Sequence, residues 1–266
     1  MSIYSEIAKL EKENKTFAIA TIISTKGSTP RTSAKMIVKS DSSIIGTIGG
    51  GIVESYVIEH ALEAINANGS RVIEYKLNKE AKDGIHMDCG GDMAFFIEVV
   101  PSSVEIVIIG AGHVGNAVYK QACLLNYNTV MVDNSKTLVD EKRFPKARSI
   151  YIDEDIQVAI NGVKINSNTC IVIVTRDCDE EALEAVIDSE AGYIGMIGSA
   201  KKVAKIMSRM RNKGEIEERI NFINAPIGLD IGAETPEEIA LSIMAEIMKV
   251  KSDKTGLVLK EIKKHE

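Results

Sequence analysis

A six-residue segment constrains the fold of this chain more than any other, because residues 110–115 read GAGHVG, a Gly-x-Gly-x-x-Gly motif. The motif follows an apolar run at residues 104–109, which predicts a buried strand, and it opens a segment of helical spacing at residues 113–125. Asp133 ends the next predicted strand, 23 residues after Gly110. This context predicts a Rossmann-type fold in which a diphosphate lies at a helix N-terminus and Asp133 accepts hydrogen bonds from ribose hydroxyls.

The glycine motif also predicts which residues contact a nucleotide. Glycines allow a tight turn and a close approach of the backbone, and His113 is the first residue of the predicted helix. The predicted contacts are Gly110, Gly112, His113, Gly115 and Asp133. Two alternatives stay open: a fold of this type can persist without its ligand, and His113 can serve only to cap local structure.

The rest of the C-terminal part alternates predicted strands with predicted helices. The strands are expected at residues 129–132, 149–152, 170–174 and 193–197, with helices at 179–189, 200–211 and 235–249. The last helix begins with Thr235, Pro236 and, three residues after the cap, Glu238, a strong set of start signals. This order is typical of a parallel sheet with crossover helices.

The N-terminal part reads differently and predicts a small α+β unit. Helices are expected at residues 3–10 and 52–66, and strands at 16–24, 35–39, 43–47, 71–77 and 93–100. The predicted fold class is therefore α/β, with a C-terminal Rossmann-like parallel sheet and a smaller N-terminal α+β domain. We expect the domains at residues 1–100 and 104–250, followed by a charged tail at 251–266.

Composition narrows the functional classes. The 32 basic and 38 acidic side chains give a net charge of −6, which argues against non-specific nucleic-acid binding. No apolar run approaches the roughly 20 residues that span a bilayer, and the first residues lack the basic and apolar regions of a secretory signal. The four cysteines form no Cys-x-x-Cys pair. We therefore expect a cytoplasmic protein with reduced thiols, without membrane or nucleic-acid partners.

Two N-terminal motifs offer groups that recognise anions. Residues 27–31 read GSTPR, and the Arg31 guanidinium suits a phosphate or carboxylate, although it is equally compatible with a solvated side chain in an ordinary turn. Three glycines at residues 49–51, Gly50 and Gly51 among them, precede a predicted helix and could form an anion nest. Glu54 lies in the first turn of that helix, where it binds a ligand or simply complements the helix dipole.

Further candidates lie in loops. Cys89 stands before two glycines, where a thiol can become a thiolate and serve as a soft metal ligand; the alternative is an inert buried cysteine. The segment TRDC at residues 175–178 follows a predicted strand, at the end where open α/β sheets bind ligands. Asp230 lies in a glycine-punctuated loop at residues 225–233 and either binds a ligand or holds the loop.

The order of these motifs resembles the XdhC/CoxI family. The motifs are GSTPR, GGG-x-V-E, M-x-CGG, GAGHVG, YIGMIGS-x-x-K and APIGLDIGA-x-TPEEIA-x-SI, and they extend from about Phe17 to Glu246. The family comprises maturation factors of molybdenum hydroxylases such as xanthine dehydrogenase. The resemblance implies an accessory protein, rather than a turnover enzyme, that binds molybdenum cofactor as molybdopterin or its dinucleotide form. It also implies help in installing the terminal sulfido ligand, delivery to an apo-hydroxylase, and a cysteine desulfurase-type sulfurase as partner.

The resemblance also carries residues with it. Those that fall on the family's motifs, and are implied to bind the cofactor, are Arg31, Gly50, Gly51, Glu54, Cys89, Gly110, Gly112, His113, Gly115, Asp133, Ser199, Lys202 and Asp230. Cys89 is the implied molybdenum contact. Three positions depart from the family pattern: Ile52 replaces a second cysteine, Cys178 replaces a histidine, and Ser33 replaces a glycine. The resemblance therefore does not support a mechanism that uses two N-terminal cysteines or that histidine.

Two other functions remain open at this stage. One is a nicotinamide-dependent oxidoreductase that binds NAD(P) in the same fold, against which the chain offers no evident acid–base pair for hydride transfer. The other is a nucleotide-binding regulatory protein. We also expect a homodimer, because symmetry often completes a crevice made by small domains.

Overall fold

The computed structural model describes residues 2–76 and 91–262 of the 266-residue chain. The chain divides into two compact units, Met1–Ser102 and Ser103–Glu266. No helix in the described ranges is long and apolar enough to cross a membrane.

The first unit is built on an antiparallel sheet. Its strands are β1 (Phe17–Lys26), β2 (Lys35–Lys39), β3 (Ile44–Gly46), β4 (Arg71–Lys76) and β5 (Asp92–Val100). They pair in the order β3-β2-β1-β5-β4, with Ile19 of β1 opposite Ile37 of β2. Because β1 is central, its first residues, Phe17–Ala20, are buried on both faces of the sheet.

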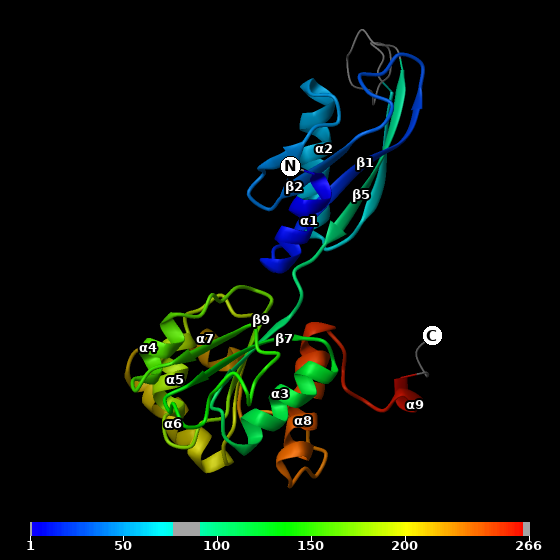
Figure 1. The fold of residues 1–266 in the computed structure, drawn as a ribbon. Coiled ribbons are helices and arrows are strands. Elements are labelled where there is room, and N and C mark those ends of the chain that lie inside the picture. The colour runs from blue at the N-terminus through cyan, green and yellow to red at the C-terminus, as the bar shows by residue number, and fades with distance from the viewer. Residues whose placement is uncertain (1, 77–90, 263–266) are drawn as a thin grey trace. The chain divides into compact units, whose positions relative to one another are not determined.

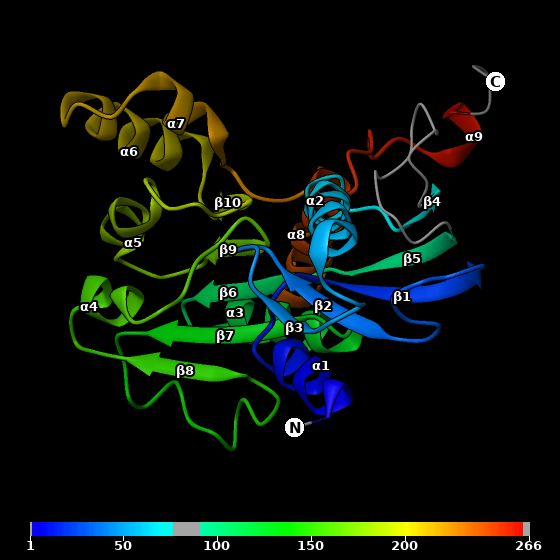
Figure 2. The ribbon, with the colours of Figure 1, turned by 90° about the horizontal axis from the view of Figure 1, so that it is seen from above.

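Two helices cover the two faces of this sheet (Figures 1 and 2). Helix α2 (Gly51–Asn66) packs over Ala18 and Ala20 of β1, whereas α1 (Ile3–Lys12) packs through Leu10 over Phe17. The alternation of side chains along β1 accounts for this division, since successive residues point to opposite faces.

The second unit contains a parallel sheet. Its strands are β6 (Glu105–Ile109), β7 (Asn128–Asp133), β8 (Ser149–Ile152), β9 (Thr169–Ile173), β10 (Tyr193–Met196) and β11 (Ile223–Asn224). The order is β11-β10-β9-β6-β7-β8, and every neighbouring pair is parallel. This is the doubly wound order of a Rossmann fold, in which the strand order reverses between β6 and β9.

Helices cover both faces of the parallel sheet (Figure 1). On one face lie α3 (His113–Leu124) and α8 (Pro236–Lys251). On the other face lie α4 (Ile156–Asn161), α5 (Asp179–Val186), α6 (Ala200–Asn212) and α7 (Glu217–Phe222). A short helix, α9 (Leu259–Ile262), follows and buries no residue.

The predicted fold class is confirmed, with a Rossmann-like parallel sheet and a separate antiparallel sheet. The elements that the sequence pattern missed are α4, α7, β11 and α9. The missed helices have six residues or fewer and β11 has two, too short for a periodic pattern to stand out. The fold places the carboxyl ends of β6, β7 and β9 side by side. Polar residues such as Asp133, Thr175 and Arg176 lie at these strand ends.

Candidate functional site

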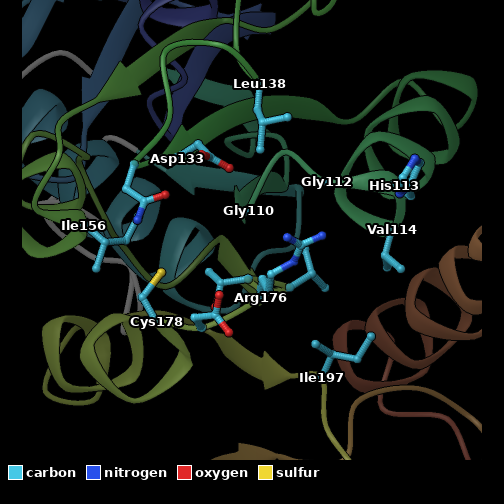
Figure 3. A pocket seen from close by; sticks show the side chains of 14 residues that line it. Gly110, Gly112, His113, Val114, Asp133, Leu138, Ile156, Arg176, Cys178 and Ile197 are labelled. Carbon is cyan, nitrogen blue, oxygen red and sulfur yellow. The ribbon is translucent and has the colours of Figure 1, made fainter.

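A cavity of about 670 Å³ lies at the carboxyl ends of β6, β7 and β9. It is lined by Gly110, Gly112, His113, Val114, Asp133, Asn134, Leu138, Ile156, Val174, Thr175, Arg176, Asp177, Cys178 and Ile197. Figure 3 shows Asp133 at the end of β7 and Arg176 in the loop after β9, on either side of the glycine turn. The structure thus brings together Gly110, Gly112, His113 and Asp133, as the sequence predicts for a nucleotide site.

The three glycines of this turn have different structural roles. Gly110 has φ +111°, and a Cβ there would lie 2.5 Å from the Val174 carbonyl oxygen. A Cβ at Gly115 would lie 1.8 Å from the Gly110 carbonyl oxygen, so this glycine lets α3 approach β6. A Cβ at Gly112, in contrast, would meet no atom within 4 Å. Gly110 and Gly115 are therefore required by the fold, whereas Gly112 leaves space in the cavity.

Helix α3 begins without a side-chain cap, because its N-cap residue is Gly112. The backbone N–H groups of a helix's first turn have no acceptor within the helix, and no capping side chain accepts from them here. With the positive end of the helix dipole, these groups make the turn suitable for an anion such as a diphosphate.

Asp133 links the glycine turn to the end of β7. It is 5 % exposed, and its carboxylate accepts a hydrogen bond of 2.6 Å from the Ala111 N–H and one of 2.8 Å from the Ser135 N–H. A carboxylate has further lone pairs, so both bonds leave room for ribose hydroxyls. Asp133 therefore holds the turn in shape and still faces the cavity.

The loop after β9 forms another wall of the cavity. Arg176 is exposed, and it makes no hydrogen bond or ion pair with any residue of the described ranges. The Cys178 thiol is directed into the cavity in Figure 3. Burial raises the pKa of this thiol, and the nearby carboxylates of Asp179 and Asp133 raise it further. At neutral pH Cys178 is consequently a thiol and not an activated thiolate.

Ser199 and Lys202 do not line the cavity. The Ser199 hydroxyl caps α6 by accepting a hydrogen bond of 3.3 Å from the Lys202 N–H. The Lys202 ammonium forms an ion pair with the buried carboxylate of Asp179. Asp179 in turn accepts a hydrogen bond from the hydroxyl of Thr175, which lines the cavity.

The C-terminal motif forms a loop that is fastened to α8. Glu246 accepts hydrogen bonds of 2.8 Å from the Gly228 N–H and 2.6 Å from the Tyr193 hydroxyl. The Ser242 hydroxyl donates to the Leu229 carbonyl oxygen over 2.6 Å. Asp230 is exposed and does not line the cavity. The loop is thus held by Glu246 and Ser242, and binding by Asp230 stays a prediction.

The motifs of the first unit converge at one end of its sheet. A Cβ at Gly49 would lie 2.8 Å from Cβ of Pro30 and 3.9 Å from Cγ of Arg31, so the GSTPR turn lies against the glycine loop. A Cβ at Gly91 would lie 2.4 Å from the Ser28 carbonyl oxygen. Three motifs that are separate in the sequence therefore meet around the turn at residues 27–31.

Glu54 fixes the conformation of the glycine loop. Its Oε2 atom accepts hydrogen bonds from the Thr47 hydroxyl at 2.5 Å, the Ile48 N–H at 3.1 Å and the Gly50 N–H at 3.2 Å. Gly50 and Gly51 have φ of +77° and +66° and face open space. Glu54 thus holds Gly50 and Gly51 in a left-handed conformation next to the N-terminus of α2.

Cys89 lies outside the described residues, so its prediction as a molybdenum contact has no structural account here. Within residues 2–76 and 91–262, no group of three or more His, Cys, Asp or Glu side chains is placed to hold a metal ion. The sequence analysis did not single out six of the cavity residues, namely Val114, Asn134, Leu138, Ile156, Val174 and Ile197. Among these, Val114 lies within the glycine motif and Asn134 directly follows Asp133 at the strand end.

Comparison with known families accounts for both units. Residues 106–247 match the family described as the XdhC Rossmann domain, and residues 10–76 match the XdhC and CoxI family. The chain belongs to the XdhC/CoxI family. The first match begins in β6 and ends in α8, so it contains the whole glycine turn and the cavity of this XdhC/CoxI chain.

Relatives of this XdhC/CoxI chain include three bacterial proteins. YqeB of Escherichia coli K12 is 39% identical over 96% of this chain and 47% of its own length. A probable xanthine dehydrogenase subunit of Bacillus subtilis 168 is 24% identical over 59% of this chain and 46% of its own. The molybdenum cofactor insertion chaperone PaoD of Escherichia coli K12 is 23% identical over 88% and 83%. The chain thus spans about half the length of two of these relatives.

A solved structure has the same fold. It is a Bacillus halodurans protein described as a xanthine dehydrogenase, with a TM-score of 0.51 and 19% identity. The alignment covers 96% of this chain and 97% of that one. At this identity the likeness establishes the shared fold alone.

Proposed function

We propose that this chain is an accessory protein that binds molybdenum cofactor, as molybdopterin or its dinucleotide form, during maturation of a molybdenum hydroxylase of the xanthine dehydrogenase type. In this role it supports sulfuration of the cofactor and its insertion into the apo-enzyme. The cofactor is cargo, and the chain itself performs no turnover.

The observation that carries the proposal is the cavity at the glycine turn. Its volume of about 670 Å³ is within the range of small-molecule sites. Gly112 leaves space at the uncapped N-terminus of α3, and Asp133 lies at the neighbouring strand end. This arrangement fits the nucleoside diphosphate portion of a dinucleotide cofactor. Membership in the XdhC/CoxI family and the similarity to PaoD support molybdenum cofactor as the ligand.

The first unit carries its own set of groups suited to an anion and to molybdenum. Arg31 lies next to the glycine loop that Glu54 shapes, and Cys89 stands two residues before Gly91, which packs against that turn. We assign anion recognition to Arg31 with Gly50 and Gly51, and contact with molybdenum or its sulfur to the Cys89 thiolate. In the second unit we assign cofactor binding to Asp230, while Ser199 and Lys202 act on the cavity through Asp179 and Thr175.

The proposal includes partners. An apo molybdenum hydroxylase receives the cofactor, and a cysteine desulfurase-type sulfurase supplies sulfur. The chain acts in the cytoplasm, where its thiols stay reduced, and it functions as a homodimer. Size-exclusion chromatography with light scattering tests the dimer independently of any ligand.

The rival function is a nicotinamide-dependent oxidoreductase. The same cavity favours it, because Asp133 at the end of β7 suits the 2′-hydroxyl of NAD rather than the 2′-phosphate of NADP. It predicts saturable binding of NAD together with hydride transfer to an acceptor. A sensor that only regulates a partner predicts tight nucleotide binding without retention of molybdenum.

The test is retention of the cofactor by purified protein. The protein is incubated anaerobically with molybdenum cofactor and desalted, and molybdenum and pterin are measured per chain. Gly112→Ala adds a methyl group in the open space at the glycine turn, and Gly69→Ala is a matched control, since a Cβ at Gly69 would make only an ordinary contact of 3.7 Å. Near-stoichiometric retention by wild type and Gly69→Ala, lost in Gly112→Ala, is the expected result.

Two further outcomes change the assignment. Full retention by Cys89→Ala would remove Cys89 from the binding groups while leaving the carrier function intact. No retention by wild type, with NAD bound in a parallel titration, would overturn the proposal in favour of the oxidoreductase.

A further inference from the structure

Asp179 is a buried carboxylate directly behind the wall of the cavity. It is the first residue of α5, its side chain is 1% exposed, and both of its oxygens are engaged. Oδ2 accepts from the Lys202 ammonium, and Oδ1 accepts from the Thr175 hydroxyl. Burying a carboxylate at this depth is costly unless a cation is paired with it, and Lys202 supplies that cation.

The motif Ser-x-x-Lys positions this ammonium. Ser199 caps α6 through the Lys202 N–H, which fixes the residue at which the helix begins. Lys202 then reaches Asp179 of α5 from the neighbouring helix. Neither Ser199 nor Lys202 lines the cavity, so their influence on a ligand passes through Asp179.

Thr175 is the member of this chain of contacts that faces the cavity. A hydroxyl has one proton to donate and two lone pairs that accept. Because the proton goes to the Asp179 carboxylate, the hydroxyl offers a ligand its lone pairs, which the neighbouring Cys178 thiol also contacts. The Thr175 oxygen therefore pairs with an O–H or N–H group and repels a bare carbonyl or phosphate oxygen.

The strand order places Thr175 with respect to a bound diphosphate. The glycine turn follows β6, which lies between β7, ending in Asp133, and β9, followed by Thr175. A nucleoside diphosphate with its ribose at Asp133 and its diphosphate on the glycine turn directs its second substituent toward β9. That substituent is the part of the ligand that Thr175 contacts.

We propose that Lys202 and Asp179 are positioning residues that fix the Thr175 hydroxyl as an acceptor, so that the cavity selects nucleoside diphosphates whose second substituent carries a hydrogen-bond donor. The inference rests on the proposed function in that the cavity binds the nucleotide portion of the cargo. It adds a requirement on the part of the ligand beyond the diphosphate, and it needs no molybdenum.

The experiment compares ligands with and without that substituent. ADP and ADP-ribose, and UDP and UDP-glucose, form pairs in which only the second member carries hydroxyls beyond the diphosphate. Dissociation constants are measured by calorimetry for wild type, Thr175→Val, Thr175→Ser, Lys202→Met and Lys202→Arg. Thr175→Val keeps the shape and removes the acceptor, and Thr175→Ser and Lys202→Arg are conservative variants that retain the hydroxyl and the charge.

We expect the wild-type protein to bind at least one longer ligand about tenfold more tightly than the shorter ligand of the same pair. One hydrogen bond changes a dissociation constant by about a factor of ten. Thr175→Val and Lys202→Met should abolish this ratio without weakening the shorter ligand, and the conservative variants should restore it. A purely structural Lys202 would instead weaken both ligands equally. If Lys202→Met fails to fold, the two Thr175 variants and Lys202→Arg decide the question.

The inference is overturned if Thr175→Val keeps the wild-type ratio, or if wild type binds none of the four ligands. In the second case, retention of molybdenum cofactor in the desalting assay would leave the proposed function standing. If the protein instead shows the expected ratio of dissociation constants but retains no molybdenum, the inference stands and the proposed function fails. The two failures are therefore distinguishable.

Discussion

Alanine substitutions in the glycine turn separate the glycine that the fold requires from the one that the ligand requires. At most helical positions Gly→Ala stabilises a helix by about 1 kcal/mol. At Gly115 the added Cβ would lie 1.8 Å from the Gly110 carbonyl oxygen, which is 1.2 Å inside the 3.0 Å limit for such contacts. The oxygen belongs to the backbone, so α3 must move away from β6.

The magnitude follows from the cost of overpacking a buried contact, about 1–3 kcal/mol. The sign is therefore opposite to that of helix propensity, and we expect Gly115→Ala to lower the free energy of unfolding by about 2 kcal/mol. In a unit of this size, a loss of about 2 kcal/mol lowers Tm by about 4–8 °C. Gly112→Ala, at φ −63° with no atom within 4 Å of the new Cβ, should change stability by less than about 1 kcal/mol.

The assay combines thermal unfolding followed by circular dichroism with the cofactor retention measurement. Gly115→Ala should lose stability, whereas Gly112→Ala should melt like wild type and lose ligand. A Gly115→Ala protein with the wild-type Tm would refute the close approach of α3 to β6. A Gly112→Ala protein that retains its full complement of cofactor would refute the placement of the ligand at the glycine turn.

Three further predictions concern charged and titrating groups. Glu54→Ala removes the acceptor of three hydrogen bonds and should lower the free energy of unfolding by about 2–3 kcal/mol in urea titrations, while Glu54→Gln, which keeps an acceptor oxygen, should lose less. Lys202→Met leaves the Asp179 charge buried and unpaired, so we expect a loss of about 3–5 kcal/mol, reduced in the double variant with Asp179→Asn. Burial raises the pKa of the Cys178 thiol, and it raises that of Cys170 to about 11. Alkylation followed peptide by peptide should therefore show Cys178 reacting with a midpoint pH above that of an ordinary thiol, and Cys170 reacting last. A fast reaction of Cys178 at pH 7 would contradict the described environment.

The parts of the fold that could be predicted are those in which the sequence alone limits the backbone. The apolar run before Gly110, the glycine spacing and the position of Asp133 predicted a strand, a turn, a helix and a second strand, and the cavity lies where they meet. Fixed spacing is informative here because only glycine permits the close approaches at Gly110 and Gly115.

Short elements were not predictable in the same way. Helices α4 and α7 have six residues each, below the length at which an isolated helix is stable. They form because Ile156 and Ile220 pack into the core beneath them, a tertiary cause that no window of the sequence contains. Residues 259–262, expected as part of a charged tail, form the short helix α9.

Residue roles depend on contacts across the chain, and this limits what a motif can tell. Glu54 is suited to bind a ligand by its position in a first helical turn, yet its Oε2 atom already accepts three hydrogen bonds from its own loop. Two of the donors are the backbone N–H groups of Ile48 and Gly50. Because backbone N–H groups are present whatever the side chains, the sequence does not indicate these two bonds. Glu54 therefore fixes the shape of the glycine loop.

Lys202 illustrates the same point at longer range. Its partner Asp179 lies 23 residues away on another helix, and the residue that meets the cavity is Thr175. The pattern Ser-x-x-Lys indicates a lysine at this position, but it does not indicate which carboxylate the lysine pairs with. If the ligand ratio responds to Lys202 and Thr175 together, then the motif in this chain specifies the direction of one hydroxyl proton. A ratio that responds to Thr175 alone would make the ion pair a matter of stability, and the free energy of unfolding of Lys202→Met would be its whole effect.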